Sequence, residues 1–174
     1  MKIQSLSEKI WRPFRLTDIF SIRATSSGID KIKLTLHEGK LPYITRSDRN
    51  NGIQTFICKQ EKYKTDKGNS ITVGLDTQTA FYQPIDFYTG QNIQVLTNDQ
   101  LNLYVAQFFL SLLKNTLSIF SWGGNGATLT RLRRSKIMLP VTDSGSPDFD
   151  YMEAFVKNLT AAQYRKYLDY IDDK

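Results

Sequence analysis

The chain has 174 residues, 40% hydrophobic residues and a formal net charge of +6, which suits one compact domain and is short for two. A single cysteine, Cys58, and a single histidine, His37, exclude an intrachain disulfide and a multi-thiolate metal site. No stretch approaches the length of a membrane span. The composition therefore predicts a soluble, unexported protein of a reducing cytoplasm, with no membrane partner.

The positive charge is unevenly spread. Residues 1–140 hold 19 Lys and Arg against 10 Asp and Glu, whereas residues 141–174 hold 4 against 7. The body is thus +9 and the tail −3. This asymmetry suggests that the body meets a polyanion and the tail meets something else, although charge alone also fits a merely basic protein.

The first two thirds of the chain predict a sheet. Residues 11–22 predict a turn or short helix that leads into a strand. Short runs rich in β-branched and aromatic residues follow, and Gly, Asn or Asp separate them, at residues 41–45, 54–58, 70–75, 80–88 and 92–96. Their spacing near ten residues predicts a mostly antiparallel, curved sheet.

Two helices are predicted beyond that sheet. Thr97 to Gln100 form a capping-box pattern before apolar residues at helical spacing, which predicts a core helix over residues 98–114. A strand at 136–141 and a turn at 143–147 precede a second helix from about Asp150, with Asp150 and Glu153 as its capping box. The expected fold is α+β, with one domain over residues 1–148 and a C-terminal helix over 149–174.

That last helix has one clear apolar face, made by Met152, Phe155, Val156, Leu159 and Ala162. Lys166 interrupts this face, and the tyrosines beyond it wrap further round the helix. Two interpretations stay open: the last turns pack on a partner helix, or the helix docks on its own domain.

A basic segment lies between the two helices. Glycines at positions 123, 124 and 126 precede four cations without an acid, Arg131, Arg133, Arg134 and Lys136. Loop amides of this kind can approach phosphate, and the cations supply the charge that phosphate binding needs. Because neither P-loop nor G-x-G-x-x-G spacing is present, the segment indicates nucleic acid rather than a bound nucleotide.

A second contact loop follows the predicted strand at residues 41–45. It carries Arg46, Arg49, Asn50 and Asn51, whose side chains can pair bidentately with guanine and adenine edges. Asn-Asn-Gly is equally good turn chemistry, so a solvated hairpin turn is the alternative. Residues 23–33 form a further candidate loop, for which contact and solvation are equally open.

Catalytic chemistry finds little support in the sequence. Asp30, Glu38 and Lys40 superficially copy the carboxylate and lysine arrangement of magnesium-dependent nucleases. No apolar strand flanks the two acids as that geometry requires, so a small metal-dependent nuclease is kept only as an alternative. No Asn/Asp-Pro-Pro-aromatic tetrapeptide is present, so the chain should not methylate by itself, and no cofactor is expected.

Several segments together resemble a target recognition domain of Type I restriction-modification specificity subunits, in particular the branch shared with fused systems that cut on both sides of their site. The residues that carry the resemblance are Trp11-x-x-Phe14-x-Leu16-x-Asp18-Ile-Phe20, Leu41-Pro-Tyr-Ile-Thr-Arg46, Asn51-Gly-Ile53, Ala80-Phe-Tyr-Gln83, Phe120-Ser-Trp-Gly123, Leu139-Pro-Val-Thr-Asp-Ser-Gly-Ser-Pro-Asp148 and Tyr151-Met-Glu153. The resemblance covers nearly the whole chain. It implies a non-catalytic DNA specificity component of a restriction-modification complex.

The resemblance also implies roles for residues. Base-reading groups would lie on the loop that holds Arg46, Ser47, Asn50 and Asn51, and backbone-binding groups near Asn125, Thr128 and Arg131 to Arg134. The implied partners are double-stranded DNA and a DNA methyltransferase subunit, with a restriction subunit and a second copy of this chain as further candidates. The C-terminal helix, through Phe155, Leu159 and Ala162, would pair with another helix. A protein that only occupies or inhibits a restriction subunit is the third hypothesis.

Overall fold

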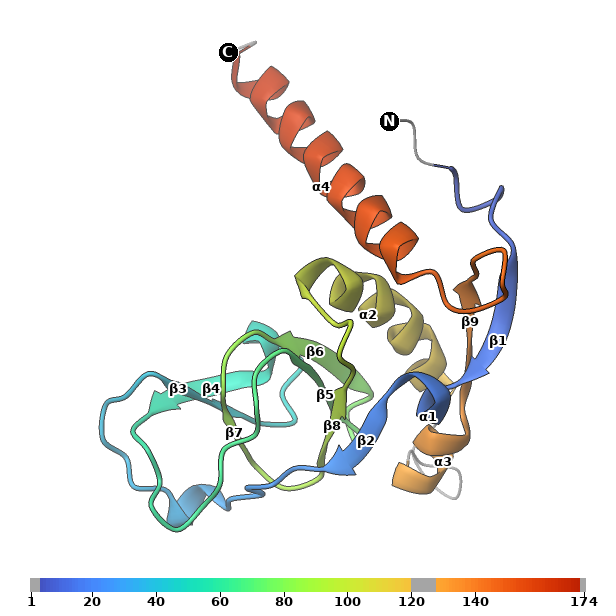
Figure 1. The fold of residues 1–174 in the computed structure, drawn as a ribbon. Helices are drawn as coiled ribbons and strands as arrows, with labels where there is room; N and C mark the ends of the chain where they lie inside the picture. The colour runs from blue at the N-terminus through green and yellow to red at the C-terminus, as the bar shows by residue number, and fades with distance from the viewer. Residues whose placement is uncertain (1–3, 120–127, 173–174) are drawn as a thin grey trace.

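The strands of the described residues, 4–119 and 128–172 of the computed structural model, form three small sheets. In chain order the elements are β1 (Trp11–Arg15), α1 (Leu16–Ile19), β2 (Ser21–Ala24), the 3-10 turn η1 (Lys31–Lys33), β3 (Leu41–Ile44), the 3-10 turn η2 (Asn50–Gly52), β4 (Ile53–Ile57), β5 (Ser70–Gly74), β6 (Thr79–Gln83), β7 (Tyr88–Thr89), β8 (Ile93–Thr97), α2 (Leu103–Ser118), α3 (Leu129–Arg134), β9 (Lys136–Pro140) and α4 (Phe149–Asp172). Figure 1 shows their arrangement. The α+β prediction is confirmed.

The main sheet has the strand order β2-β8-β5-β6 and is antiparallel throughout. Strand β5 is buried along its whole length because both faces of the sheet are covered. α2 packs on one face. On the other face, Val95 packs with Ile44 and Phe87, which come from the smaller β4-β3-β7 sheet and its surroundings.

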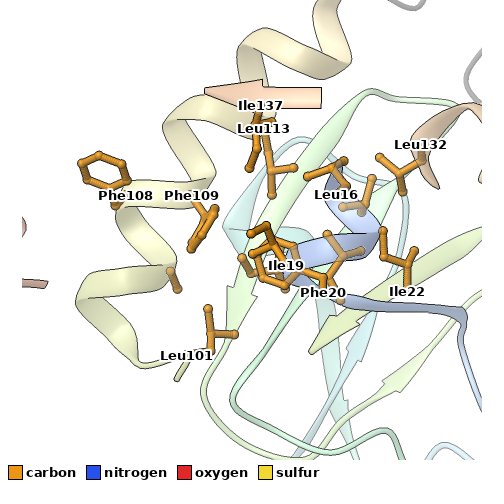
Figure 2. Close-up of a cluster of buried hydrophobic side chains, with 14 of the residues drawn as sticks. Leu16, Ile19, Phe20, Ile22, Leu101, Phe108, Phe109, Leu113, Leu132 and Ile137 are labelled. Carbon is orange, nitrogen blue, oxygen red and sulfur yellow. The ribbon is translucent and has the colours of Figure 1, made fainter. Parts of the chain in front are cut away.

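The larger core lies between the main sheet, α1 and α2. Phe109 and Leu113 of α2 and Ile71 of β5 are fully buried, and the ring of Phe109 meets Phe20 edge-on at 4.8 Å between centroids. Figure 2 shows how side chains from α1, α2, α3 and β9 converge on this cluster. The predicted placement of the core in the sheet and the first long helix is confirmed.

Two predicted strands differ from the structure. Residues 80–88 do not form one strand, because β6 ends at Gln83 and Pro84 follows, which has no N–H for a ladder bond. The chain then re-enters a sheet as β7, which pairs in parallel with β3. Residues 11–22 contain the predicted short helix and strand, and also a missed strand, β1, which pairs with β9.

The predicted caps of both long helices lie at the wrong residues. α2 begins at Leu103, and the side chain of Asn102 accepts hydrogen bonds from the backbone N–H groups of Tyr104 and Val105. For α4, the Asp148 side chain accepts a bond from Tyr151 N–H at 3.0 Å, so Asp148 rather than Asp150 serves as the cap. In the turn at residues 98–101, Asn98 accepts from Gln100 N–H through its side chain and from Leu101 N–H through its backbone oxygen.

The first turns of α4 dock on α2. Tyr151 and Met152 are buried, and Phe155 meets Phe108 edge-on. Glu153 accepts hydrogen bonds from Lys157 and from Asn102, and both lower the pKa of its carboxyl group, the lysine more. The later turns project from the body, as Figure 1 shows. Among the helices of the described residues, none has the length and apolarity needed to span a membrane.

Candidate nucleic-acid interface

The loop between β3 and β4, residues 45–52, turns back sharply on left-handed backbone. Asn50, Asn51 and Gly52 all have positive φ, between 50° and 75°, a conformation that asparagine and glycine tolerate better than other residues. The loop closes through hydrogen bonds from Gly52 N–H to Arg49 O and from Thr45 N–H to Gly52 O. The Asn-Asn-Gly turn chemistry anticipated from the sequence is therefore present.

Its polar side chains divide into two groups. Asn51 donates from Nδ2 to Tyr82 O at 2.9 Å, and its own carbonyl accepts from the Gln83 side chain, so it anchors the loop to β6. The Ser47 hydroxyl accepts from Arg49 N–H. Arg46, Arg49 and Asn50 are exposed and have no such bond to β6, whereas Asn51 is exposed in spite of its bonds. The structure thus gives Ser47 and Asn51 roles in shaping the loop and presents Arg46, Arg49 and Asn50 outward.

Three loops from different parts of the chain meet at Arg46. Its Nη1 forms an ion pair with Asp76, in the turn between β5 and β6. Asn92, at the start of β8, donates from Nδ2 to the same Asp76 oxygen at 3.3 Å. The Arg46 side chain stays 48% exposed in this pair, so it still faces solvent.

Two concavities lie beside this meeting point. One of about 300 Å³ has Arg46, Lys31, Gln54 and Gln91 among its lining residues. The other, of about 730 Å³, is a groove between the β3–β4 loop, the β5–β6 hairpin and α2, lined by Asp48, Asn51, Thr77, Gln78, Thr79, Ala80, Phe81, Gln107, Leu110, Ser111 and Lys114. The sequence did not indicate that Lys31, Gln91 or Lys114 lie near the loop, since they are far from it along the chain.

Residues 23–29, part of the second candidate loop, are held against the body by a buried carboxylate. Asp66 is fully buried and accepts hydrogen bonds from the Arg23 guanidinium at 2.5 Å, the Thr25 hydroxyl at 2.6 Å and Ser26 N–H at 3.0 Å. Ile29 is buried beside Tyr43, whose hydroxyl donates to Ile29 O at 2.7 Å. Burial raises the pKa of Tyr43, which keeps that donor protonated.

The segment with Arg131, Arg133 and Arg134 is a helix, α3, rather than the loop expected from its glycines. The Thr128 hydroxyl caps it by accepting from Arg131 N–H at 3.2 Å. Arg133 donates to the backbone oxygen of Ile22 in β2 at 2.8 Å, and Arg133, Arg134 and Lys136 are all exposed. Asn125 and the glycines at 123–126 lie outside the described residues.

The two predicted contact regions lie at opposite edges of the main sheet. α3 contacts β2, one edge strand, whereas η2 of the β3–β4 loop contacts β6, the other. Three strand spacings of about 4.8 Å separate these edges by about 14 Å, comparable with the width of the major groove of B-DNA. They are therefore two separate regions and not one continuous patch.

The residues of the nuclease alternative are placed differently from what metal chemistry needs. Asp30 caps the turn η1 by accepting from Ile32 N–H, and Glu38 lies outside any strand. Within the described ranges, no group of three or more His, Cys, Asp or Glu side chains could hold a metal ion. The alternative built on Asp30, Glu38 and Lys40 thus gains no support.

The predicted partner face of α4 is partly covered. Phe155 is half-buried against α2, while Leu159 is 52% exposed and Ala162 is exposed. An apolar groove of about 690 Å³ runs between the two helices, with Phe108, Leu112, Phe155, Leu159 and Tyr164 among the residues that line it. The first turns of α4 therefore dock on their own domain, and the following turns present an exposed apolar face.

Comparison with known proteins identifies the family. The chain is 30% identical over 148 residues to the Type II restriction enzyme BgcI specificity subunit S.BcgI of Heyndrickxia coagulans, covering 84% of this chain and 42% of that protein. Its fold is similar to the S subunit of the Type-I restriction-modification system from M. genitalium (TM-score 0.67, 15% identity, 94% of this chain and 41% of that one). It is also similar to the HsdS subunit from Thermoanaerobacter tengcongensis (TM-score 0.61, 15% identity, 93% and 39%).

This chain spans about two fifths of the length of each of those proteins. The sequence model of the Type I restriction modification DNA specificity domain matches residues 8–167, which is nearly the whole chain. The chain therefore belongs to the family of Type I restriction modification DNA specificity domains.

Proposed function

We propose that this chain is a non-catalytic DNA specificity module, which reads part of a DNA target and positions a methyltransferase, and through it a nuclease, on that target in the cytoplasm. The observation that carries the proposal is the β3–β4 loop, which presents Arg46, Arg49 and Asn50 outward at a point where three loops meet. Family membership supports it, since the matching model describes a DNA specificity domain.

Base reading is assigned to the exposed members of that loop. Arginine pairs bidentately with guanine and asparagine with adenine in the major groove, so Arg46, Arg49 and Asn50 have the chemistry that sequence readout requires. Ser47 and Asn51 contribute by holding the loop in shape, and a base contact by Asn51 would first require its bond to Tyr82 O to open. Residues 1–148 would form the reading domain.

Phosphate contact is assigned to α3 and to Lys136, the first residue of β9. Arg134 and Lys136 are exposed there, and Arg131 belongs to the same short helix. Phosphate contacts fix the register of a protein on DNA without reading sequence. Because α3 flanks the sheet edge opposite the β3–β4 loop, these contacts would orient the reading loop across the groove.

Assembly is assigned to residues 149–174. The exposed part of the α4 face, with Leu159 and Ala162 beyond the docked Phe155, fits a second amphipathic helix, supplied by another copy of this chain or by a methyltransferase subunit. A protein that lies along α4 would extend the contact already made with α2.

The function is tested by selection. The purified chain, alone and with a methyltransferase subunit of the same system, is mixed with duplexes randomised at their centre, and bound duplexes are sequenced. The proposal requires enrichment of a defined motif, at least in the presence of the methyltransferase. Binding to the methyltransferase without any enrichment would favour the interaction-only hypothesis instead.

The phosphate assignment predicts a change in salt dependence. Arg134→Ala combined with Lys136→Ala should flatten the slope of log affinity against log salt by about 2 units, because each lost phosphate contact is worth about 0.9. Affinity for random duplex is measured by fluorescence anisotropy over a salt series. Arg165→Ala with Lys166→Ala makes the same charge change on the outer turns of α4 and should leave the slope unchanged. Equal slopes for both double variants would remove α3 from the interface.

A further inference from the structure

The Arg46–Asp76 pair joins the loop that we propose reads DNA to a carboxylate 30 residues away in the chain. Asp76 lies in the β5–β6 turn, so its position depends on the main sheet and not on the β3–β4 loop. Such a pair is unexpected on a surface meant for DNA, because a carboxylate there repels phosphate. The surroundings of the two side chains indicate the role of the Arg46–Asp76 pair.

Asp76 is held firmly. It lies two residues beyond the end of β5, and β5 is paired on both sides, with β6 and with β8. Asn92 donates to the same carboxylate oxygen that receives Arg46 Nη1, and it lies in the turn directly before β8 with a positive φ of 61°. Two neighbouring strands therefore fix the acceptor of the arginine.

The backbone of Arg46 is close to the same strand. A Cβ placed on Gly74, at the end of β5, would lie 3.9 Å from the Arg46 Cα and only 2.7 Å from the Thr77 hydroxyl oxygen. Gly74 thus leaves room for the threonine hydroxyls of the β5–β6 turn, and the end of β5 lies within ordinary contact distance of the Arg46 backbone. Both ends of the Arg46 side chain, its Cα and its guanidinium, are consequently set by the main sheet.

The pair leaves the arginine able to read a base. The contact with Asp76 uses Nη1, and a guanidinium has five N–H donors in a planar fork. With 48% of the side chain exposed, the remaining donors can face a ligand. Guanine offers two adjacent acceptors, N7 and O6, in the major groove, which match such a fork.

We propose that Asp76 is a positioning residue for base recognition: it orients the Arg46 guanidinium so that its free edge meets the major-groove edge of a guanine. The inference rests on the proposed DNA-reading function and adds a residue and a base to it. Without Asp76 the arginine keeps its charge but loses its fixed direction. It then contacts phosphates or several bases, so discrimination falls while general affinity does not.

The test uses the full chain and the motif that it selects from randomised duplexes. Arg46→Ala first identifies the G·C pair at which preference is lost. Affinities are then measured for the selected duplex and for one with that single pair replaced, at one salt concentration. We expect wild-type protein to discriminate about 10- to 100-fold, as a good bidentate contact does. Asp76→Ala should reduce this ratio about tenfold, while affinity for unrelated duplex stays equal or rises.

A double variant and a matched control sharpen the result. In an Arg46→Ala background, Asp76→Ala should change the ratio no further, because the carboxylate acts through the arginine. Asp86→Ala breaks another exposed ion pair, Lys67–Asp86, and should leave the ratio at that base pair unchanged. Asp76→Asn retains an acceptor for Nη1 and gives an intermediate loss; it replaces Asp76→Ala if circular dichroism shows that the alanine variant is unfolded.

Three outcomes would overturn the proposal. An equal loss on both duplexes would make Asp76 a support of the fold alone. A higher ratio in Asp76→Ala would mean that the carboxylate holds the arginine away from DNA. A selected motif at which Arg46→Ala changes no base preference would remove Arg46 from readout while leaving the proposed function intact, whereas the failure of wild-type protein to select any motif would contradict the function itself.

Discussion

Replacing Asp66 by alanine should lower the free energy of unfolding by about 3 kcal/mol, because a buried charge-assisted network would lose its acceptor. The fully buried carboxylate receives the Thr25 hydroxyl, Ser26 N–H and one edge of Arg23. The guanidinium can recover water, since the Arg23 side chain is 40% exposed, but the other two donors are part-buried. Urea unfolding followed by circular dichroism measures the change.

Two variants separate the charge from the space it occupies. Asp66→Asn keeps the shape but turns an N–H₂ group toward donors, so it should destabilise nearly as much as alanine. Asp99→Ala removes an exposed acid and should change stability by less than about 0.5 kcal/mol. If Asp66→Ala proves as mild as Asp99→Ala, solvent reaches this site and the network does not hold the loop.

The same network links stability to the proposed reading surface. Residues 25–29 are fixed by Asp66, Ile29 accepts the hydroxyl bond of Tyr43, and Tyr43 belongs to β3, whose continuation carries Arg46. A variant that destabilises the Asp66 network should therefore also reduce the ratio of affinities between the selected duplex and the altered one. Asp76 acts directly on Arg46 and Asp66 acts two steps away, so the first should change readout without a comparable loss of stability.

Local pattern predicted most elements because their signals lie within a few residues. β3, β4, β5, β8 and β9 are runs of β-branched and aromatic residues, and their ends fall within about two residues of the expected ones. β1 was missed since its partner β9 lies more than 120 residues later and Pro13 weakens its strand signal. The helix caps were misplaced because Asn, Asp and Thr residues are clustered before α2, and only tertiary contacts decide which of them caps.

Only part of the candidate site could be predicted from the sequence, because local signals do not show which distant residues come together. Arg46, Arg49 and Asn50 could be found from their own chemistry on a polar loop. Asp76 and Asn92 could not, because nothing local indicates that two turns 30 and 46 residues away meet Arg46. Nor could the sequence show that the Arg133 guanidinium donates to the backbone of β2. The basic composition indicates a polyanionic partner, whereas the pairing of distant strands decides which side chains can face that partner.

Leu159→Asp should abolish assembly and leave the fold intact. Leu159 is 52% exposed, so a carboxylate there stays hydrated in the isolated chain and should cost less than about 0.5 kcal/mol. Packed against a partner helix, the same carboxylate would be buried without a counter-ion, which is far more costly. Light scattering after size exclusion measures self-association, and co-purification measures binding of the methyltransferase subunit.

Its matched controls lie one and seven residues away. Asn158→Asp makes a similar charge change at a neighbouring exposed position and should preserve assembly. Met152→Asp places the carboxylate where α4 docks on its own core, fully buried, and should unfold the domain, a loss above about 4 kcal/mol. If Leu159→Asp unfolded the chain as Met152→Asp does, the outer turns of α4 would be part of the domain. If it left both association and fold unchanged, the exposed face of α4 would have no partner to lose, and the module would read DNA without coupling through this helix.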